Sequence, residues 1–232
     1  MIMLIILLGG LLFFSINVGG GIAWLVSRLF QISTSGLSLL CGGFLVGLLS
    51  LDIIQSALKM YKSFGIFLGV LIGYLFFLLL RNLFHPSYTQ SPSVYLLMIA
   101  VLVHTIPLSI TIGNLIENSI VGITITASVI LHHLPEGFVL TTAFLSQEKK
   151  LWKLFSCFFC LSLFFSLFIW IGQSVNLTTK EQGILMGISI GLIAATSISE
   201  FILHNIKDVP FKTFAIYILM GFLLSNLFHL LL

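Results

Sequence analysis

Charged residues are scarce in this sequence: Asp, Glu, Lys and Arg together make up only 7% of the 232 residues. A soluble domain carries roughly 25%, so this chain cannot cover a water-exposed surface. Hydrophobic residues account for 59% of the sequence, 22 residues are Phe, and the mean hydropathy is +1.20. The composition predicts an integral membrane protein whose exterior faces lipid. Residues 1–232 suit one transmembrane domain without a separate soluble domain.

Other absences narrow the function. Cys41, Cys157 and Cys160 all lie in apolar runs, and an odd number of cysteines argues against a disulfide framework. No His-Glu-x-x-His pattern occurs, and the Gly19–Gly21 run follows no strand, so it is not a phosphate-binding loop. The net charge of +3 lies in short connectors, which predicts no nucleic-acid partner. We expect no cleaved signal segment, no enzymatic activity and no resident cofactor.

Long apolar runs dominate what is present. A hydrocarbon core of roughly 30 Å requires about 20 apolar residues per helix, and division at the polar clusters leaves eight such runs. They lie near residues 1–27, 35–58, 64–84, 94–115, 119–143, 152–174, 182–204 and 211–231. The sequence therefore predicts an all-α polytopic membrane protein with eight transmembrane helices.

The distribution of Lys and Arg predicts the orientation, because cytoplasmic loops carry an excess of these residues. With the N-terminus outside, the cytoplasmic connectors hold Arg28, Arg81, Lys149, Lys150, Lys153, Lys207 and Lys212. Lys59, Lys62 and Lys180 fall on the external side. We therefore expect both termini to be extracytoplasmic, with the plasma membrane as the location and the lipid bilayer as a partner.

Two short internal echoes indicate a repeat. A proline follows three residues after His104 and again three residues after His132. An acid follows nine residues after Gly43 and nine residues after Gly191. Inverted repeats leave paired signals of this kind around a binding site. They predict a 3+2+3 pseudo-symmetric arrangement around a central hairpin formed by the fourth and fifth runs.

Only three of the seven acids lie within apolar runs: Asp52, Glu136 and Glu200. An ionised side chain near the bilayer centre costs roughly 2.5–3.5 kcal/mol on insertion scales. These acids must therefore face the protein interior or a water-filled path, or stay protonated, and each is a functional candidate. For Asp52 and Glu200, an interfacial position or a pairing with a loop lysine is the alternative interpretation.

The segment His132–Gly137 in the fifth run reads His-His-Leu-Pro-Glu-Gly. His132 and Glu136 are four residues apart, so they share one helix face and can bind one small divalent cation. His133 is rotated by about 100° and is expected to point to a different neighbour. The proline in this segment, and Pro107 in the fourth run, leave carbonyl groups without their usual donors, which is tolerable only beside a cavity.

A tight hairpin would bring the fourth run to the same depth as the fifth. The candidate metal ligands are then His104, His132, His133 and Glu136. A structural hydrogen-bond cluster is the alternative for these residues. Asp52 would lie toward the outside of the membrane, and Glu200 and His204, again four residues apart, toward the inside. Together, Asp52, the central cluster of His and Glu residues, and the pair Glu200 and His204 form a candidate relay for a cation.

At His132–Gly137 the sequence resembles the ZIP family of metal transporters (Zrt- and Irt-like proteins), whose fourth and fifth helices carry His-Asn-x-Pro-Glu-Gly and variants of it. The segment from His104, followed by Gly113, is similar to a decayed copy of this motif. Gly43–Asp52 and Gly191–Glu200 are similar to the family's second and seventh helices as far as the acid. The resemblance spans the whole chain and implies eight helices, external termini and passage of Zn²⁺, Fe²⁺ or Mn²⁺, usually toward the cytosol.

By position, the resemblance implies His104, His132 and Glu136 as primary ligands and places His133 in the slot of a second-site ligand. The fourth run departs from the family, because Thr105 replaces the usual Asn and Leu108 the usual Glu. The sixth run, in addition, carries no acid.

These departures affect the number and kind of ion. With one carboxylate at the centre, too little negative charge offsets the repulsion between two divalent ions. We therefore expect one ion, with His133 or water completing its coordination. Imidazole ligands favour zinc-like over magnesium-like ions. Because imidazole binds metal only when neutral, uptake should fall as the pH drops toward about 6.

The sequence thus predicts a divalent transition-metal transporter that works by alternating access. Two alternatives stay open. One is a non-transporting relative that senses metal or scaffolds a partner, which the loss of Glu at Leu108 favours. The other is an intramembrane zinc hydrolase, for which no nucleophile stands out. A homodimer is also compatible with the sequence.

Overall fold

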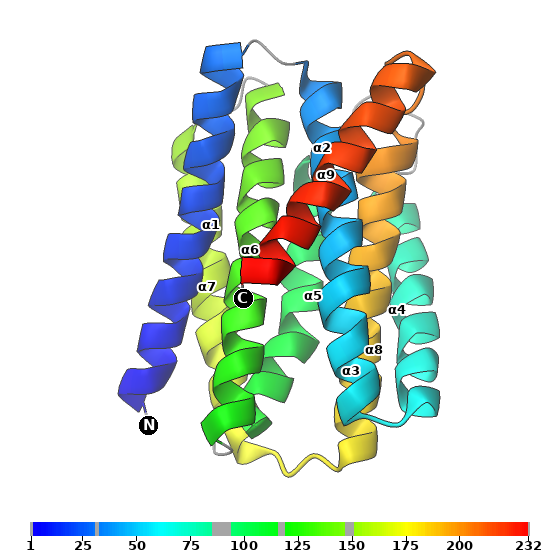
Figure 1. Cartoon of the computed structure of the whole chain (residues 1–232). Helices are drawn as coiled ribbons and strands as arrows, with labels where there is room; N and C mark the ends of the chain where they lie inside the picture. Colours follow the sequence, from blue (N-terminus) through cyan, green and yellow to red (C-terminus); the bar gives the residue numbers. More distant parts are fainter. Residues whose placement is uncertain (1, 31–32, 85–93, 116–118, 147–150, 232) are drawn as a thin grey trace.

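The computed structural model describes residues 2–30, 33–84, 94–115, 119–146 and 151–231. In these ranges the chain forms a bundle of long helices without strands (Figure 1). The predicted all-α fold is therefore confirmed. The loop acids Glu117 and Glu148, and Lys149 and Lys150, lie outside the described residues, as does the side chain of Asp52.

Eight helical rods run through the described residues. They are α1 (Ile2–Phe30), α2–η1–α3 (Thr34–Leu48, Leu49–Ile53 and Ile54–Met60), α4 (Ser63–Phe84), α5 (Val94–Leu115), α6 (Ser119–Ser146), α7 (Leu151–Ser174), α8–η2 (Thr179–Thr196 and Ser197–Leu203) and α9 (Phe211–Leu231). Each rod corresponds to one predicted apolar run, and the ends differ by only a few residues.

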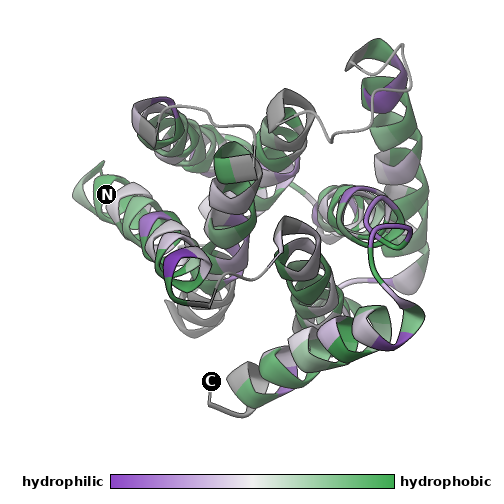
Figure 2. Ribbon diagram, turned by 90° about the horizontal axis from the view of Figure 1, so that it is seen from above, coloured by the Kyte–Doolittle hydropathy of each residue, from purple (hydrophilic) through white to green (hydrophobic). Residues whose placement is uncertain are grey.

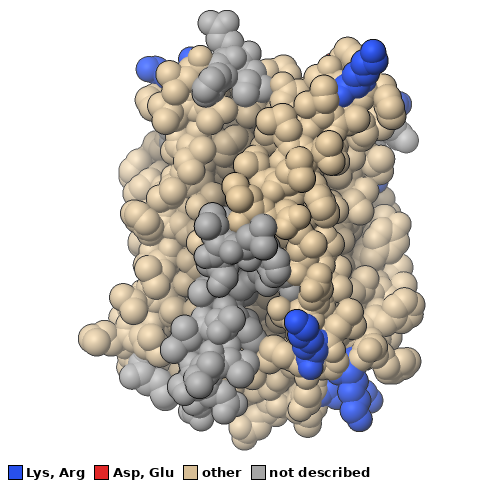
Figure 3. Space-filling model, viewed as in Figure 1, with Lys and Arg blue, Asp and Glu red and all other residues tan. Residues whose placement is uncertain are grey.

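The helices have the length and apolarity of membrane spans. Five stretches in the described residues qualify: Ile2–Leu29, Ser35–Met60, Ser63–Leu83, Trp152–Ser174 and Thr179–Leu203. Two apolar helices are shorter, at Val101–Leu115 and Phe211–Leu227. Hydrophobic residues are spread along the helices (Figure 2), and on the face in Figure 3 Lys and Arg gather toward the two ends of the bundle. These are the properties of a helical membrane protein, in which backbone hydrogen bonds must be satisfied within each span.

Glycines bring pairs of helices into close contact. A Cβ atom on Gly137 of α6 would lie 2.0 Å from the carbonyl oxygen of Ile16 in α1. A Cβ atom on Gly113 of α5 would lie 2.2 Å from the carbonyl oxygen of Ile169 in α7. No side chain fits at either position, so α6 packs on α1 and α5 packs on α7 through their backbones. In the same way, α8 packs on α4, and α2 packs on α9.

Two rods contain a π-helical turn at matching positions. The turn Leu49–Ile53 begins six residues after Gly43, and the turn Ser197–Leu203 begins six residues after Gly191. Gly43 lies against the backbone of α9, and Gly191 lies against the backbone of α4. π-Helical turns occur frequently at functional sites. The echo in the sequence therefore has a counterpart in the backbone, and both turns contain the acid of the echo, Asp52 or Glu200.

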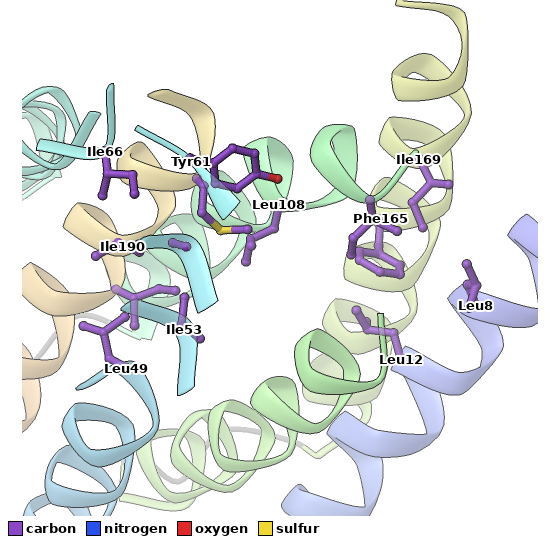
Figure 4. Packing of buried hydrophobic residues seen from close by; sticks show 14 of the residues in the cluster. Leu8, Leu12, Leu49, Ile53, Tyr61, Ile66, Leu108, Phe165, Ile169 and Ile190 are labelled. Atoms are coloured by element: carbon purple, nitrogen blue, oxygen red, sulfur yellow. The ribbon is translucent and has the colours of Figure 1, made fainter. Parts of the chain in front are cut away.

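Two apolar clusters occupy successive levels of the bundle. The first apolar cluster includes Leu8, Leu12, Leu49, Ile53, Leu108, Ile112, Phe165, Ile169, Ile190 and Ile193, most of which Figure 4 labels. The second apolar cluster includes Ile16, Leu45, Val101, Val139, Leu140, Phe144, Phe158 and Phe201. Along α5, Val101 belongs to the second cluster and Leu108 to the first, so His104 lies between the two clusters. The apolar layers therefore bracket the level of the predicted site.

Candidate metal centre

The central pair of helices, α5 and α6, supplies all four predicted ligands. Each helix contains a proline, Pro107 in α5 and Pro135 in α6. A hydroxyl group from another helix donates a hydrogen bond to a carbonyl near each of them: Ser189 Oγ to the carbonyl of His104, and Ser15 Oγ to that of Ile130, both at 2.8 Å. These bonds give the buried serine hydroxyls an acceptor in the apolar interior and tie α5 and α6 to α8 and α1.

Three imidazole rings surround the carboxylate of Glu136. His104 Nε2 lies 2.8 Å from Oε1, and His132 Nε2 lies 3.1 Å from the same oxygen. His133 Nδ1 makes a short contact with the other oxygen, Oε2. All four side chains are at most 4% exposed. The structure thus brings the candidate ligands together at one buried point.

The position of His133 corrects one expectation. This side chain does not point to a different neighbour, because it shares the carboxylate of Glu136 with the other two imidazoles. Residues three apart on a helix are also neighbours, so His133 reaches the acid from the adjacent side of α6. Its ring also packs edge-on against Phe165 of the first apolar cluster, with the ring centroids 6.2 Å apart.

The group formed by His104, His132 and Glu136 can bind a metal ion. One ligand atom from each of these residues lies within 4.8 Å of the others. Two ligand atoms in a tetrahedral zinc site stand about 3.3 Å apart, since each bond is about 2.0–2.1 Å long. The atoms here are close to that spacing, and His104 and Glu136 would only need to separate slightly to admit an ion. His133 lies beside this group but is not one of its three members.

A small cavity adjoins the cluster. Its volume is about 20 Å³, and His104 and Glu136 form part of its wall together with Thr196 at the end of α8 and Ser197 at the start of η2. A space of roughly 10–15 Å³ holds one water molecule, so this cavity has room for one particle of that size. The rest of the wall is apolar.

Two polar residues in this wall were not predicted from the sequence. Thr196 and Ser197 are 7% and 1% exposed, and the side chain oxygen of Ser197 has no hydrogen-bond partner in the described residues. Their position one turn before Glu200 is the signal that could have revealed them, because it places hydroxyl groups on the same helix as an intramembrane acid. They connect the level of Glu136 to the π-helical turn that contains Glu200.

The predicted relay residues have different surroundings. Glu200 is 9% exposed, so its side chain lies inside the bundle. His204 is partly exposed and follows directly after the π-helical turn Ser197–Leu203. For Asp52, the backbone lies in the other π-helical turn, and its side chain is outside the description.

Leu108 takes no part in the metal-capable group. It is 1% exposed and belongs to the first apolar cluster, where Figure 4 shows it near Tyr61. The position of the second carboxylate implied by the family resemblance is therefore filled by packed hydrocarbon in this chain.

Neither the known protein families nor the curated proteins contain a match to this chain. Its fold and site define a class of protein nonetheless: a helical membrane protein with a buried His/Glu group capable of binding a metal ion.

Proposed function

We propose that this protein is a transporter that moves a divalent transition metal, with zinc as the preferred ion, through the site between α5 and α6. The observation that carries the proposal is the arrangement of three imidazoles around one buried carboxylate. The proposal agrees with the resemblance to the ZIP family. Polar groups this costly in an apolar interior mark ion pathways in membrane proteins.

The apolar layers on both sides of the site support transport by alternating access. The first apolar cluster separates the site from one end of the bundle, and the second cluster separates it from the other end. Passage of an ion from Glu136 to either end of the bundle would therefore require the helices that carry these clusters to move. Opening one cluster at a time would expose the site to one side of the membrane and then to the other.

The helix pairs support a 3+2+3 pseudo-symmetry. In this symmetry α1 corresponds to α7, α2 to α8, α4 to α9 and α5 to α6. The packed pair α1–α6 then corresponds to the pair α7–α5, and the pair α2–α9 corresponds to the pair α8–α4. All four pairs are closely packed through glycines. The same exchange relates the π-helical turn with Asp52 to the one with Glu200. Relative movement of two such halves is the usual basis of alternating access.

Two features support a single ion at the centre. The adjoining cavity is about 20 Å³ in volume, and Glu136 is the one carboxylate in the metal-capable group. Three neutral imidazoles and one carboxylate leave a single divalent ion with one uncompensated charge, and a second ion would add two more. Nitrogen-rich coordination also favours zinc over magnesium and calcium. On one side, Thr196 and Ser197 line the cavity, and Glu200, in the π-helical turn that begins at Ser197, would continue the path.

Metal uptake into proteoliposomes tests the proposal. Wild-type protein should accumulate Zn²⁺ faster than empty liposomes, and both His132→Ala and Glu136→Ala should reduce this uptake to the background. Glu181→Gln is the matched control, because Glu181 is exposed and belongs to the capping box that begins α8. Equal uptake by wild type and both site variants would rule out this route.

A non-transporting metal sensor is the second candidate, and the burial of Leu108 in the apolar cluster favours it. A sensor would bind zinc with the same dependence on Glu136 but would show no uptake above empty liposomes. An intramembrane zinc hydrolase would instead turn over a lipid or peptide added to the same vesicles. Binding, uptake and turnover measured on one preparation therefore separate the three functions.

A further inference from the structure

A groove on the surface of the bundle runs between α4 and α8, which lie side by side in Figure 1. Its volume is about 390 Å³, within the range of roughly 300–1,000 Å³ for small-molecule sites. The α8 side of the groove presents small residues, Gly191, Ala194 and Ala195, while Val70 and Phe77 line the α4 side. Gly191 itself lies against the backbone of Val70, whereas Ala194 and Ala195 line the open part of the groove. Apart from Tyr74, Arg81 and Ser199, the residues that line the groove are apolar.

Arg81 lies at one end of this groove, in the last turn of α4. Its guanidinium donates one long hydrogen bond, of 3.4 Å, to the hydroxyl of Ser199. In the described part of the chain, no carboxylate forms a salt bridge with it. Most of the five N–H donors of this cation therefore remain available. Guanidinium groups match the geometry of phosphate, to which they bind through two parallel hydrogen bonds.

The length of the groove fits one leaflet of a bilayer. Val70 and Arg81 mark its extent along α4, and eleven residues at 1.5 Å each span about 16 Å. Half of a hydrocarbon core of roughly 30 Å is about 15 Å. A chain whose headgroup lies at Arg81 would therefore reach the bilayer centre at the far end of the groove.

We propose that the groove between α4 and α8 is a binding site for one anionic phospholipid, with its phosphate on Arg81 and an acyl chain along Val70, Phe77 and Ala194. Charge complementarity selects an anionic lipid over a zwitterionic one, because a net negative headgroup attracts the guanidinium more strongly. Cytoplasmic leaflets are rich in such lipids, and Arg81 is on the cytoplasmic side in the orientation expected from the sequence.

The same groove touches the helix that lines the metal-capable site. Ile198, Ser199 and Leu203 of the π-helical turn form part of the groove wall, and the neighbouring Thr196 and Ser197 face the central cavity. A bound lipid would therefore pack against the outer side of the turn and hold it in place. This consequence concerns binding and local order, and it does not depend on metal transport.

Native mass spectrometry of protein from nanodiscs tests the lipid site. The probe is phosphatidylglycerol mixed with phosphatidylcholine. Wild-type protein should retain one phosphatidylglycerol in preference to phosphatidylcholine, and Arg81→Gln should weaken this preference about tenfold or more, as expected for loss of charge-assisted hydrogen bonds. Lys212→Gln is the matched control, because Lys212 is an exposed cation in the first turn of α9, near the same end of the bundle. An unchanged preference in Arg81→Gln, or an equal loss in Lys212→Gln, would overturn the proposal.

A second variant keeps the charge and fills the groove. Ile198 is 45% exposed and lines the groove, so Ile198→Trp should displace the acyl chain while Arg81 stays in place. We expect it to lose the bound lipid as well. Hydrogen exchange of residues Ser197–Leu203 gives an independent readout: phosphatidylglycerol should slow exchange there in wild type and not in Arg81→Gln. Full lipid retention by Ile198→Trp, or exchange that ignores the lipid in wild type, would contradict the assignment.

Discussion

The substitution Glu136→Gln tests the centre most directly. It preserves the shape of the side chain and removes the one carboxylate on which His104, His132 and His133 converge. Loss of a residue that only orients a metal ligand typically costs about 10–100-fold in metal affinity. Loss of the direct anionic ligand should therefore lower the zinc affinity by at least about 100-fold.

This loss can be measured as a change in thermal stability. At a zinc concentration of about 100 times the wild-type Kd, binding stabilises the native state by about 2.7 kcal/mol, and for the variant by no more than about 0.4 kcal/mol. For a chain of this length, 1 kcal/mol shifts Tm by about 2–4 °C. Zinc should therefore raise Tm by about 5–11 °C in wild type and by at most about 2 °C in the variant.

The assay is thermal unfolding in detergent at one zinc concentration, with and without excess chelator. Glu181→Gln carries the same chemical change on an exposed helix end, so it should keep the full zinc-dependent shift. If Glu136→Gln shows the wild-type shift, the carboxylate is not a ligand and the reasoning about the centre fails.

Three further predictions concern packing and protonation. Gly137→Ala should destabilise the protein by about 1–3 kcal/mol, because the new Cβ meets the backbone of Ile16. The control Gly21→Ala, whose new Cβ has nothing within 4 Å, should be neutral or gain up to about 1 kcal/mol from helix propensity. Thermal unfolding compares the two variants, and equal effects would refute the close contact. Burial raises the pKa of Tyr61 to about 12, so its phenol is neutral, and its hydroxyl has no hydrogen-bond partner in the described residues. Tyr61→Phe should therefore leave Tm unchanged or raise it. A clear loss of stability would reveal a hydrogen bond to this hydroxyl. Zinc affinity measured by calorimetry should weaken as the pH falls from about 7.5 to about 5.5, since imidazole nitrogens must be unprotonated to bind metal, and affinity independent of pH would argue against histidine ligands.

The helices were predictable because the bilayer imposes one simple requirement on them. Long runs such as Ser63–Phe84 can satisfy their backbone hydrogen bonds in lipid only as helices. Their ends were less predictable. The rod that begins at Thr179 starts earlier than the apolar pattern suggested, because Thr178 and Glu181 form a capping box outside the apolar run.

The echo between the second and seventh runs was a good guide to the backbone. Gly43 and Gly191 precede their acids by nine residues, and both π-helical turns fall at the same register. The echo between the fourth and fifth runs was a weaker guide. In α6 the glycine contact follows His132 by five residues, but in α5 it follows His104 by nine. Measured from its histidine, the point at which α5 contacts its neighbouring helix therefore lies about one turn further along the chain than the corresponding point in α6. A comparison of short motifs does not reveal this shift.

Sequence alone was sufficient for the type of fold and for three predicted ligands, His104, His132 and Glu136, that form the metal-capable group. Apolar length implies spanning helices, and the cost of ionised groups in lipid singles out Glu136 and the histidines near it. Spacing along one helix was also enough to pair His132 with Glu136.

Only the tertiary structure decided how these groups meet. His104 of α5 contacts Glu136 of α6, and His133 shares the same carboxylate. Thr196 and Ser197 form part of the cavity wall from the rod α8–η2. Such contacts depend on how far each helix is rotated and shifted against its neighbours. Those quantities follow from backbone contacts at glycines and from π-helical turns, and local sequence patterns constrain them only weakly.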